Sequence, residues 1–298
     1  MKKPALAVFS LLVLANVFSW AAFSEARQPK PLTADFFNIG QGDFSFIETP
    51  EGNQIVVDAG PDYNKAAEKL SAIMPFWDRT IDLVIITHPE EDHFAGVFGI
   101  LKSYKIGKIA WTGVAKETEK FKELEGLINE QKEKYGTAIF EIKAGDRILA
   151  GSAQIDVLFP FFVNKEAVGD TSNDSSLVLR LDFQKNSMLF TGDISSNEEA
   201  EIMARGENIK TDILKVAHHG SKYSTSEEFL AQSTPKLAII QSGINNPYGH
   251  PSAEVLTRLD DFGIKIVRND FQGDVKILSD GKNLQIITRP VAKTGSAL

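Results

Sequence analysis

The sequence predicts an α+β fold in which two β-sheets pack together and helices cover them on the outside. Short β patterns dominate both the beginning and the end of the chain after Leu32, with mixed patterns between them. The helical patterns alternate with the strands less strictly than a doubly wound parallel sheet requires. A hydrophobic content of 43% is ordinary for a globular protein with a sizeable core. Because no long linker follows Leu32, we expect a single domain over residues 31–290.

In the first half of the chain, apolar spacing distinguishes strands from helices. Turn residues at 49–53 stand between two β patterns, which is typical of a hairpin. The compact apolar run at 81–87 predicts a buried strand. The charged segment at 115–135 carries apolar residues at helical spacing, as a surface helix does. We therefore expect strands at 34–47, 54–57, 81–87 and 108–111, and helices at 63–74, 94–104 and 115–135.

In the second half, β patterns fill residues 139–159 and 176–190, and shorter elements follow them. The strand expected at 213–217 matters most, because it ends at the paired histidines His218 and His219. The remaining expected elements are helices at 196–205, 226–231 and 253–262, and strands at 237–241, 264–268 and 275–278.

The N-terminus has the layout of a secretory signal peptide. Lys2 and Lys3 form a short basic region, residues 5–23 are mostly apolar and uncharged, and small residues stand at Ser24 and Ala26. We predict a signal peptide over residues 1–26 that is cleaved after Ala26. An uncleaved membrane anchor is the first alternative, because about 20 apolar residues can span a bilayer, and a buried helix is the second. We therefore expect a secreted protein, or one anchored to a membrane and facing outside.

The balance of charges limits the possible partners. The chain has 32 basic and 40 acidic residues and a formal net charge of −8. This argues against a protein that coats nucleic acid through a basic surface. A nucleic-acid enzyme is still compatible with it, because bound divalent ions can supply positive charge locally. The absence of cysteine excludes disulfides and thiolate metal ligands.

All five histidines of the chain lie in three short motifs. Neutral imidazole is the commonest metal ligand in proteins, and here it is interleaved with carboxylates in runs too short to pack a core. This combination predicts a metal site that serves hydrolysis. The motifs are Thr87-His88-Pro89-Glu90-Glu91-Asp92-His93, Ala217-His218-His219-Gly220-Ser221 and Tyr248-Gly249-His250-Pro251.

The first motif follows a predicted strand, and a helix is expected to begin near Asp92. Four candidate ligands lie within six residues: His88, Glu90, Asp92 and His93. Imidazole together with carboxylate suits Zn²⁺, Mn²⁺ or Fe. The alternative interpretation is an acidic, solvated loop in which Asp92 caps a helix.

Five other residues become candidates for the site once this motif is considered. Asp193 ends an apolar strand and is a candidate ligand, although Gly-Asp is also common in turns. Asp58 ends another strand and could orient a ligand through a hydrogen bond. Adjacent strand residues point to opposite faces, so we expect only one of His218 and His219 to bind metal, and which one stays open. His250 lies in a Pro/Gly loop, where a plain surface histidine is the alternative.

Taken together, these motifs resemble the metallo-β-lactamase fold hydrolases. Within them the chain is most similar to the hydrolase domain of the ComEC-type late-competence DNA-uptake proteins and to their stand-alone relatives. The resemblance spans roughly residues 33–280. The stretches that carry it, besides the three histidine motifs, are Phe37-Asn38-Ile39-Gly40-Gln41-Gly42-Asp43, Ile55-Val56-Val57-Asp58-Ala59-Gly60-Pro61, Asn173-Asp174-Ser175-Ser176-Leu177-Val178-Leu179 and Phe190-Thr191-Gly192-Asp193.

The resemblance implies a four-layer αββα sandwich with a cleft for two divalent metal ions, zinc or manganese, at one sheet edge. It implies that His88 and Glu90 hold one ion and that Asp92 and His93 hold the second. His218 or His219 would join the second ion, and Asp193 would bridge both. Glu90 departs from the pattern, because the wider fold has His there and the competence relatives usually have Asp.

Further residues have implied supporting or catalytic roles. Asn173 or Asp174 occupies the region where other members of the fold place another histidine, and both are expected, like Asp58, to support the ligands. The implied catalytic residues are Asp92, Asp193 and His250.

These expectations lead to a secreted or membrane-tethered, metal-dependent hydrolase. A metal-bridging hydroxide would attack phosphorus or a carbonyl carbon, and the resemblance makes a DNA phosphodiester the first choice of substrate. The alternatives are a lactonase, thioesterase or β-lactamase-type hydrolase, or a catalytically silent metal-binding module. No protein partner can be inferred. Basic residues near the cleft could contact DNA, although solvated surface residues are the ordinary interpretation of Lys210, Lys215, Lys222 and Arg258.

Overall fold

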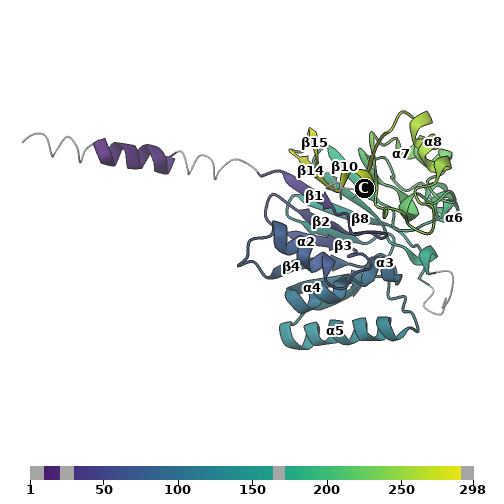
Figure 1. Ribbon diagram of the computed structural model, residues 1–298, viewed down its shortest axis with the longest axis horizontal. Helices are drawn as coiled ribbons and strands as arrows, with labels where there is room; N and C mark the ends of the chain where they lie inside the picture. Colours follow the sequence, from purple (N-terminus) through teal and green to yellow (C-terminus); the bar gives the residue numbers. More distant parts are fainter. Residues whose placement is uncertain (1–9, 21–29, 164–171, 290–298) are drawn as a thin grey trace, which may run out of the picture.

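The computed structural model describes residues 10–20, 30–163 and 172–289 (Figure 1). The predicted cleavage site after Ala26 lies outside the described residues. Residues 10–20 are helical. Among the described residues, no helix is both long and apolar enough to cross a membrane.

Two mixed sheets form the centre of the molecule. The first has the strand order β15-β14-β1-β2-β3-β4-β5-β6, and the second has the order β13-β12-β11-β10-β9-β8-β7. The strands of the first sheet are β1 (Leu32–Phe36), β2 (Ser45–Glu48), β3 (Gln54–Val57), β4 (Thr80–Ile85), β5 (Lys105–Trp111), β6 (Ala138–Glu141), β14 (Asp274–Ser279) and β15 (Leu284–Arg289). Those of the second are β7 (Arg147–Ala150), β8 (Ala153–Phe159), β9 (Val178–Phe183), β10 (Asn186–Phe190), β11 (Ile213–Lys215), β12 (Leu237–Ile240) and β13 (Lys265–Arg268).

Helices cover both outer faces of the sheets (Figure 1). They are α2 (Lys65–Ile73), α3 (Glu91–Phe94), α4 (Val97–Ser103), α5 (Glu119–Tyr135), α6 (Ser196–Ala204), α7 (Glu227–Ser233), α8 (Ala253–Asp261) and α9 (Asn269–Gln272). Local signals set their ends. Thr118 caps α5 by accepting a hydrogen bond from the backbone N–H of Phe121, and Gly136 ends that helix in a left-handed conformation. Ser195 and Glu198 form a capping box at α6.

The core has three parts that define four layers. Apolar residues such as Phe36, Ile85 and Phe190 fill the space between the two sheets. A second cluster packs α2, α4 and α5 on the outside of the first sheet, and a third packs α6, α7 and α8 on the outside of the second. The predicted αββα sandwich is therefore confirmed. Both sheets contain parallel strands, β3 to β6 in the first and β10 to β13 in the second.

The expected continuous strand at 34–47 is wrong. This segment instead contains two strands, β1 and β2, joined by a loop at residues 37–44. The apolar side chains Phe37, Ile39 and Phe44 of the loop are buried. Burial of these loop residues made the segment look like a strand. Gly42 has a φ of +136° and packs so close to the Asp92 carbonyl that a side chain would collide with it. The loop therefore lies directly against α3, where the histidine-rich motif begins its helix.

Other boundaries also differ from the expectation. The segment at 139–159 contains three strands, β6, β7 and β8, and 176–190 is divided between β9 and β10. The last strand of the described chain, β15, was not expected; it pairs antiparallel with β14 at the edge of the first sheet.

Candidate metal centre

The predicted site residues meet at the carboxyl ends of parallel strands from both sheets. Asp58 directly follows β3, and the motif from His88 to His93 follows β4. Asp193 follows β10, and His218 and His219 follow β11. Parallel strands bring their carboxyl ends to one edge of a sheet, and loops at such edges commonly carry reactive side chains.

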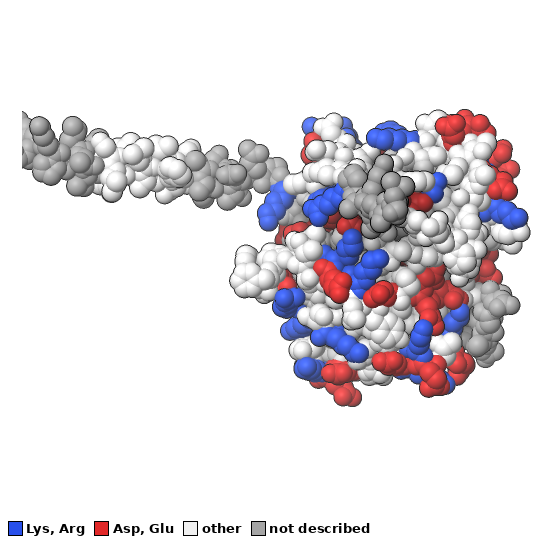
Figure 2. Space-filling model, viewed as in Figure 1, with Lys and Arg blue, Asp and Glu red and all other residues white. Residues whose placement is uncertain are grey.

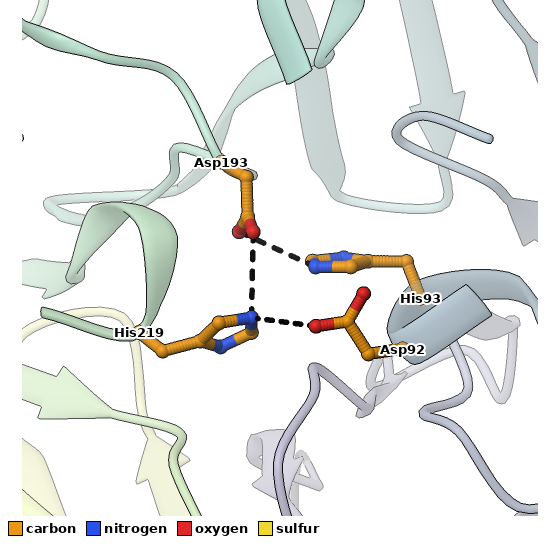
Figure 3. A group of neighbouring side chains, drawn as sticks. All are labelled: Asp92, His93, Asp193 and His219. Carbon is orange, nitrogen blue, oxygen red and sulfur yellow. Dashed lines mark hydrogen bonds and ion pairs between the residues drawn. The ribbon is translucent and has the colours of Figure 1, made fainter. Parts of the chain in front are cut away.

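Four side chains form the centre of the site. The ligand atoms of Asp92, His93, Asp193 and His219 all lie within 4.8 Å of one another. Figure 3 shows these side chains pointing toward one another from different segments of the chain. Nε2 of His93 lies 3.3 Å from Oδ1 of Asp193, and Nε2 of His219 lies 3.3 Å from its other oxygen. Nε2 of His219 is also 3.2 Å from Oδ2 of Asp92. Asp193 is thus shared between two imidazoles.

Hydrogen bonds to Nδ1 orient the rings of His93 and His219. Nδ1 of His93 lies 2.8 Å from a carboxylate oxygen of Asp58. Nδ1 of His219 lies 2.9 Å from the carbonyl oxygen of Gln241. Because these oxygens accept hydrogen bonds, each Nδ1 is the donor, and Nε2 is left to face the cluster. Such partners fix the orientation of a metal-ligating histidine.

The same arrangement extends to His88. The hydroxyl of Thr87 donates to Asp58 over 2.7 Å, so it accepts from Nδ1 of His88 over 3.0 Å. The backbone N–H of Thr87 also donates to Asp58. Asp58 therefore contacts His93 directly and His88 through Thr87. Its role in supporting metal ligands stays a prediction.

Several buried polar atoms in the site lack a hydrogen-bond partner among the described residues. Within this part of the chain, Nε2 of His88 has no hydrogen bond, and Nε2 of His93 and Oδ1 of Asp193 form none either, although the two atoms lie 3.3 Å apart as an ion pair. Such orphaned atoms are rare because they cost free energy. Imidazole nitrogen with carboxylate oxygen, and no sulfur, is a donor set for divalent ions such as Zn²⁺ or Mn²⁺. The residues present therefore fit a divalent metal.

His218 and His219 do not lie on a strand. They occupy a 3₁₀ turn, η2 (Ala217–Gly220), with left-handed φ values of 49° and 53°. The expectation that they point to opposite faces is wrong for this reason, since Nε2 of His218 also approaches Asp193, at 3.8 Å. His219 belongs to the central cluster and is buried, whereas the His218 side chain is 31% exposed.

A pocket of about 180 Å³ opens over the cluster, and most of the remaining predicted residues line it. His218, Asn173 and His250 line it, and the His218 and His250 rings lie 5.7 Å apart. Oδ1 of Asn173 and Nδ1 of His250 are buried without a partner in the described chain. Asp174 is exposed and does not contribute to this lining, so the structure does not bring it to the site.

The comparison with protein families agrees with the donor set. The model of the metallo-beta-lactamase superfamily matches residues 38–243. The chain belongs to the metallo-β-lactamase superfamily. That range contains every residue of the central cluster and leaves only His250, among the histidines, beyond its end.

The chain is similar to proteins of Bacillus subtilis and Haemophilus influenzae. The chain is 35% identical over 260 residues to ComE operon protein 3 of Bacillus subtilis. This alignment covers 81% of this chain and 32% of that protein. It is 30% identical over 273 residues to Recombination protein 2 of Haemophilus influenzae, and this alignment covers 90% of this chain and 31% of that protein. The chain thus spans about a third of the length of these relatives.

Solved structures share the fold at low identity. The metallo-beta-lactamase fold protein YhfI of Bacillus subtilis aligns with a TM-score of 0.55 at 12% identity, over 80% of this chain and 96% of that one. Igni18, a metallo hydrolase of Ignicoccus hospitalis, aligns with a TM-score of 0.51 at 15% identity, over 82% and 98%. Family, fold and donor set together support a metal-dependent hydrolase with divalent metal binding.

Burial and neighbouring carboxylates shift the pKa values of the histidines in this site in opposite directions. Burial, followed by the charge of His93, lowers the pKa of His88 to about 3, so His88 is neutral at pH 7. Burial alone would lower the pKa of His93 and of His219. The carboxylate of Asp193 outweighs burial in both, with Asp58 beside His93 and Asp43 beside His219, and holds each pKa well above its usual range.

An ion pair between Lys215 and Asp43, which was not predicted from the sequence, lies beside the cluster. Nζ of Lys215 donates to the Asp43 carboxylate and, over 3.0 Å, to the carbonyl oxygen of Gly192. Both side chains are buried, and Oδ1 of Asp43 lies 3.2 Å from Nδ1 of His219. Asp43, Asp58 and His93 have spacing that could hold a metal, but the ammonium group of Lys215 already occupies the Asp43 carboxylate.

The interpretation of Lys215 as a solvated surface lysine is therefore wrong, because β11 delivers it to the interior beside the site. Arg258 is also partly buried, and it donates to the carbonyl oxygens of Ser224 and Thr225. Lys210 and Lys222 are exposed, as surface lysines are.

Glu90 lines the pocket but does not join the central cluster. Its carboxylate accepts hydrogen bonds from Nζ of Lys116 and from the hydroxyl of Ser172. Its neighbour Glu91 is exposed and pairs with Lys120. The role of Glu90 as a metal ligand stays a prediction, since a bound ion would compete with Lys116 for the same oxygens.

Proposed function

We propose that this chain is a phosphodiesterase that cleaves DNA with two divalent ions, zinc or manganese. The observation that carries the proposal is the position of Asp193, whose two oxygens each lie 3.3 Å from a different imidazole, His93 and His219. Both of these imidazoles are assigned to one ion. Nε2 of His88 is buried without a partner in the described chain, and the His88 ring lies 4.1 Å from that of His93, so a second ion at His88 would leave Asp193 between the two ions. Two ions, when bound, supply positive charge to both the entering and the leaving oxygens of a phosphoryl transfer.

Different residues are assigned to the two ions and to the substrate. We assign His88 and Glu90 to one ion, and Asp92, His93 and His219 to the other, with Asp193 between them. His218 is partly exposed over the cluster, and its Nε2 is placed to contact a substrate oxygen.

His250 stands further out in the same pocket. Burial, followed by the charges of His219 and His218, lowers its pKa to about 4. It is therefore neutral at pH 7 and is suited to accept a proton or a hydrogen bond there.

The relatives support nucleic acid as the substrate class. Their names include ComE operon protein 3, Recombination protein 2 and Competence protein ComA of Neisseria gonorrhoeae. On the face shown in Figure 2, Lys and Arg are interspersed with Asp and Glu and form no continuous basic surface. Bound cations would therefore have to offset the repulsion between DNA and a chain of net charge −8.

A substrate panel tests the proposal. The metal-loaded chain should cleave single- or double-stranded DNA, and the rate should fall as salt rises because phosphate contacts are electrostatic. Asp92→Ala and His218→Ala should abolish cleavage while the chain stays folded, and Asp260→Ala, which removes an exposed carboxylate on α8, should not. Turnover of a lactone or thioester without any phosphodiester turnover, with both zinc and manganese, would overturn the substrate assignment.

We also propose that the chain is exported or tethered to a membrane through its N-terminus. This rests on Lys2, Lys3 and the apolar residues 5–23. N-terminal sequencing of protein recovered from the producing cell tests it. A first residue of Arg27 means cleavage, and an intact Met1 in the membrane fraction means an anchor. An intact Met1 in the cytosol contradicts both.

A further inference from the structure

A larger pocket adjoins the candidate metal centre. Its volume is about 430 Å³, within the range of about 300–1,000 Å³ that is usual for ligand pockets. It shares Gln41, Glu90, Asp92 and Tyr248 with the smaller pocket over the cluster. The two therefore form one groove that leads outward from Asp92.

The outer part of this groove has ring surfaces on its walls. Tyr248 is 68% exposed, although large aromatic side chains are usually more buried. Its ring stacks on the ring of His250, with centroids 5.8 Å apart and an angle of 24° between the planes. That stack orients the tyrosine beside the cluster. Pro61 and Pro89 also line the groove.

Gln41 provides a hydrogen-bond donor where the two pockets meet. Its side-chain oxygen accepts from the backbone N–H of Gly243 over 3.2 Å, which anchors the carboxamide. Its amide nitrogen has no hydrogen bond within the described part of the chain, so it can donate to a ligand.

The charged residues of the groove are largely neutralised in pairs. Glu91 is paired with Lys120, and Glu90 is paired with Lys116 in the metal-free chain. In the metal-loaded chain, the ion assigned to Glu90 neutralises that carboxylate in place of Lys116. A flat, mostly neutral ligand part therefore suits this wall better than a bare phosphate does.

We propose that the groove binds an unpaired nucleobase next to the scissile phosphate. Tyr248 provides the stacking surface and Gln41 donates a hydrogen bond to the bound nucleotide. In a duplex, both faces of a base are covered by its neighbours, so Tyr248 could reach only a base in a single strand or at a frayed end. The inference rests on the proposed function, and it adds a preference for single-stranded over double-stranded substrate.

Binding of a labelled, cleavage-resistant single-stranded phosphorothioate oligonucleotide to the metal-loaded full chain tests the groove. From the usual contribution of base stacking, Tyr248→Ala should weaken binding about 5- to 100-fold and raise KM for oligonucleotide cleavage. Its metal content and melting temperature should stay unchanged. Tyr248→Trp should retain affinity, because indole also stacks.

Tyr223→Ala is the matched control. Tyr223 is also 68% exposed but lines a different pocket, together with Lys222 and Arg258. Tyr248→Ala protein that binds as the wild type does, or an equal loss in Tyr223→Ala, would overturn the groove assignment.

The two proposals fail in different ways. If the wild type cleaves DNA but Tyr248→Ala leaves affinity and KM unchanged, the groove does not bind a nucleobase through Tyr248, and the proposed function stands. If the wild type binds the oligonucleotide through Tyr248 but cleaves no phosphodiester, the proposed function is wrong and the groove stands. Absence of any binding to single strands overturns the groove directly.

Discussion

Nδ1 of His93 donates to the carboxylate of Asp58 over 2.8 Å, and this bond determines which ring nitrogen faces the central cluster. Asp58→Asn should therefore weaken metal binding although Asp58 need not touch the ion. The usual loss on removing such a partner is about 10- to 100-fold in affinity. Titration of the metal-free protein with Zn²⁺ measures it. Unchanged affinity in a folded variant would mean that Asp58 does not orient His93 for a metal.

Metal binding should release protons at pH 7. Because carboxylates hold the pKa of His93 and His219 well above its usual range, both rings are protonated in the metal-free chain and must lose a proton to bind an ion. Affinity should thus rise with pH until the pH passes these raised pKa values. His88, with a pKa of about 3, contributes no proton. Calorimetry in buffers of different ionisation enthalpy counts the protons, and buffer-independent heats would contradict the assignment.

The buried ion pair should matter for folding. Lys215→Met leaves the Asp43 carboxylate buried without its partner, and breaking a buried pair in this way costs about 3–5 kcal/mol of the free energy of unfolding. The double variant with Asp43→Asn should recover part of that loss. Lys236→Met is the control, because Lys236 pairs with Asp212 but is 80% exposed, and it should change little. Urea unfolding of the metal-free proteins measures all of them. Equal stability of Lys215→Met and the wild type would refute the pairing.

Glu90 and Glu91 should differ in their effect on metal binding. Glu90→Gln should weaken it because position 90 lines the pocket with Asp92, whereas Glu91→Gln should not because Glu91 is exposed. Lys116→Met should strengthen binding, since it removes the competing ammonium group from Glu90. Competition with a fluorescent chelator gives the affinities. The same loss at both positions would mean that Glu90 is not a ligand.

The sequence was most informative where chemistry and strand ends coincide. Histidine and aspartate motifs placed directly after apolar runs identified His93, Asp193 and His219, because parallel strands bring their ends together. Apolar periodicity likewise placed most helices, including α5 and α8, within a few residues.

What the sequence could not show depends on contacts between distant segments. The partner of His219 is a backbone carbonyl, that of Gln241, and a backbone atom leaves no mark in the residue pattern. The Lys215–Asp43 pair joins β11 to the loop after β1, so neither residue looks buried on its own. The left-handed turn at His218 and His219 is likewise held by its surroundings, because the backbone of a histidine rarely adopts it alone.

Metal content of the purified full chain tests the metal centre most directly. After incubation with Zn²⁺ or Mn²⁺ and removal of free ions, elemental analysis should find about two ions per chain, as a bridged two-metal site requires. Asp193→Ala should lose the most, because the proposal places its carboxylate between both ions, and Asp260→Ala should lose none. Wild-type protein that stays free of metal with both ions, or an Asp193→Ala variant with full occupancy, would contradict the assignment.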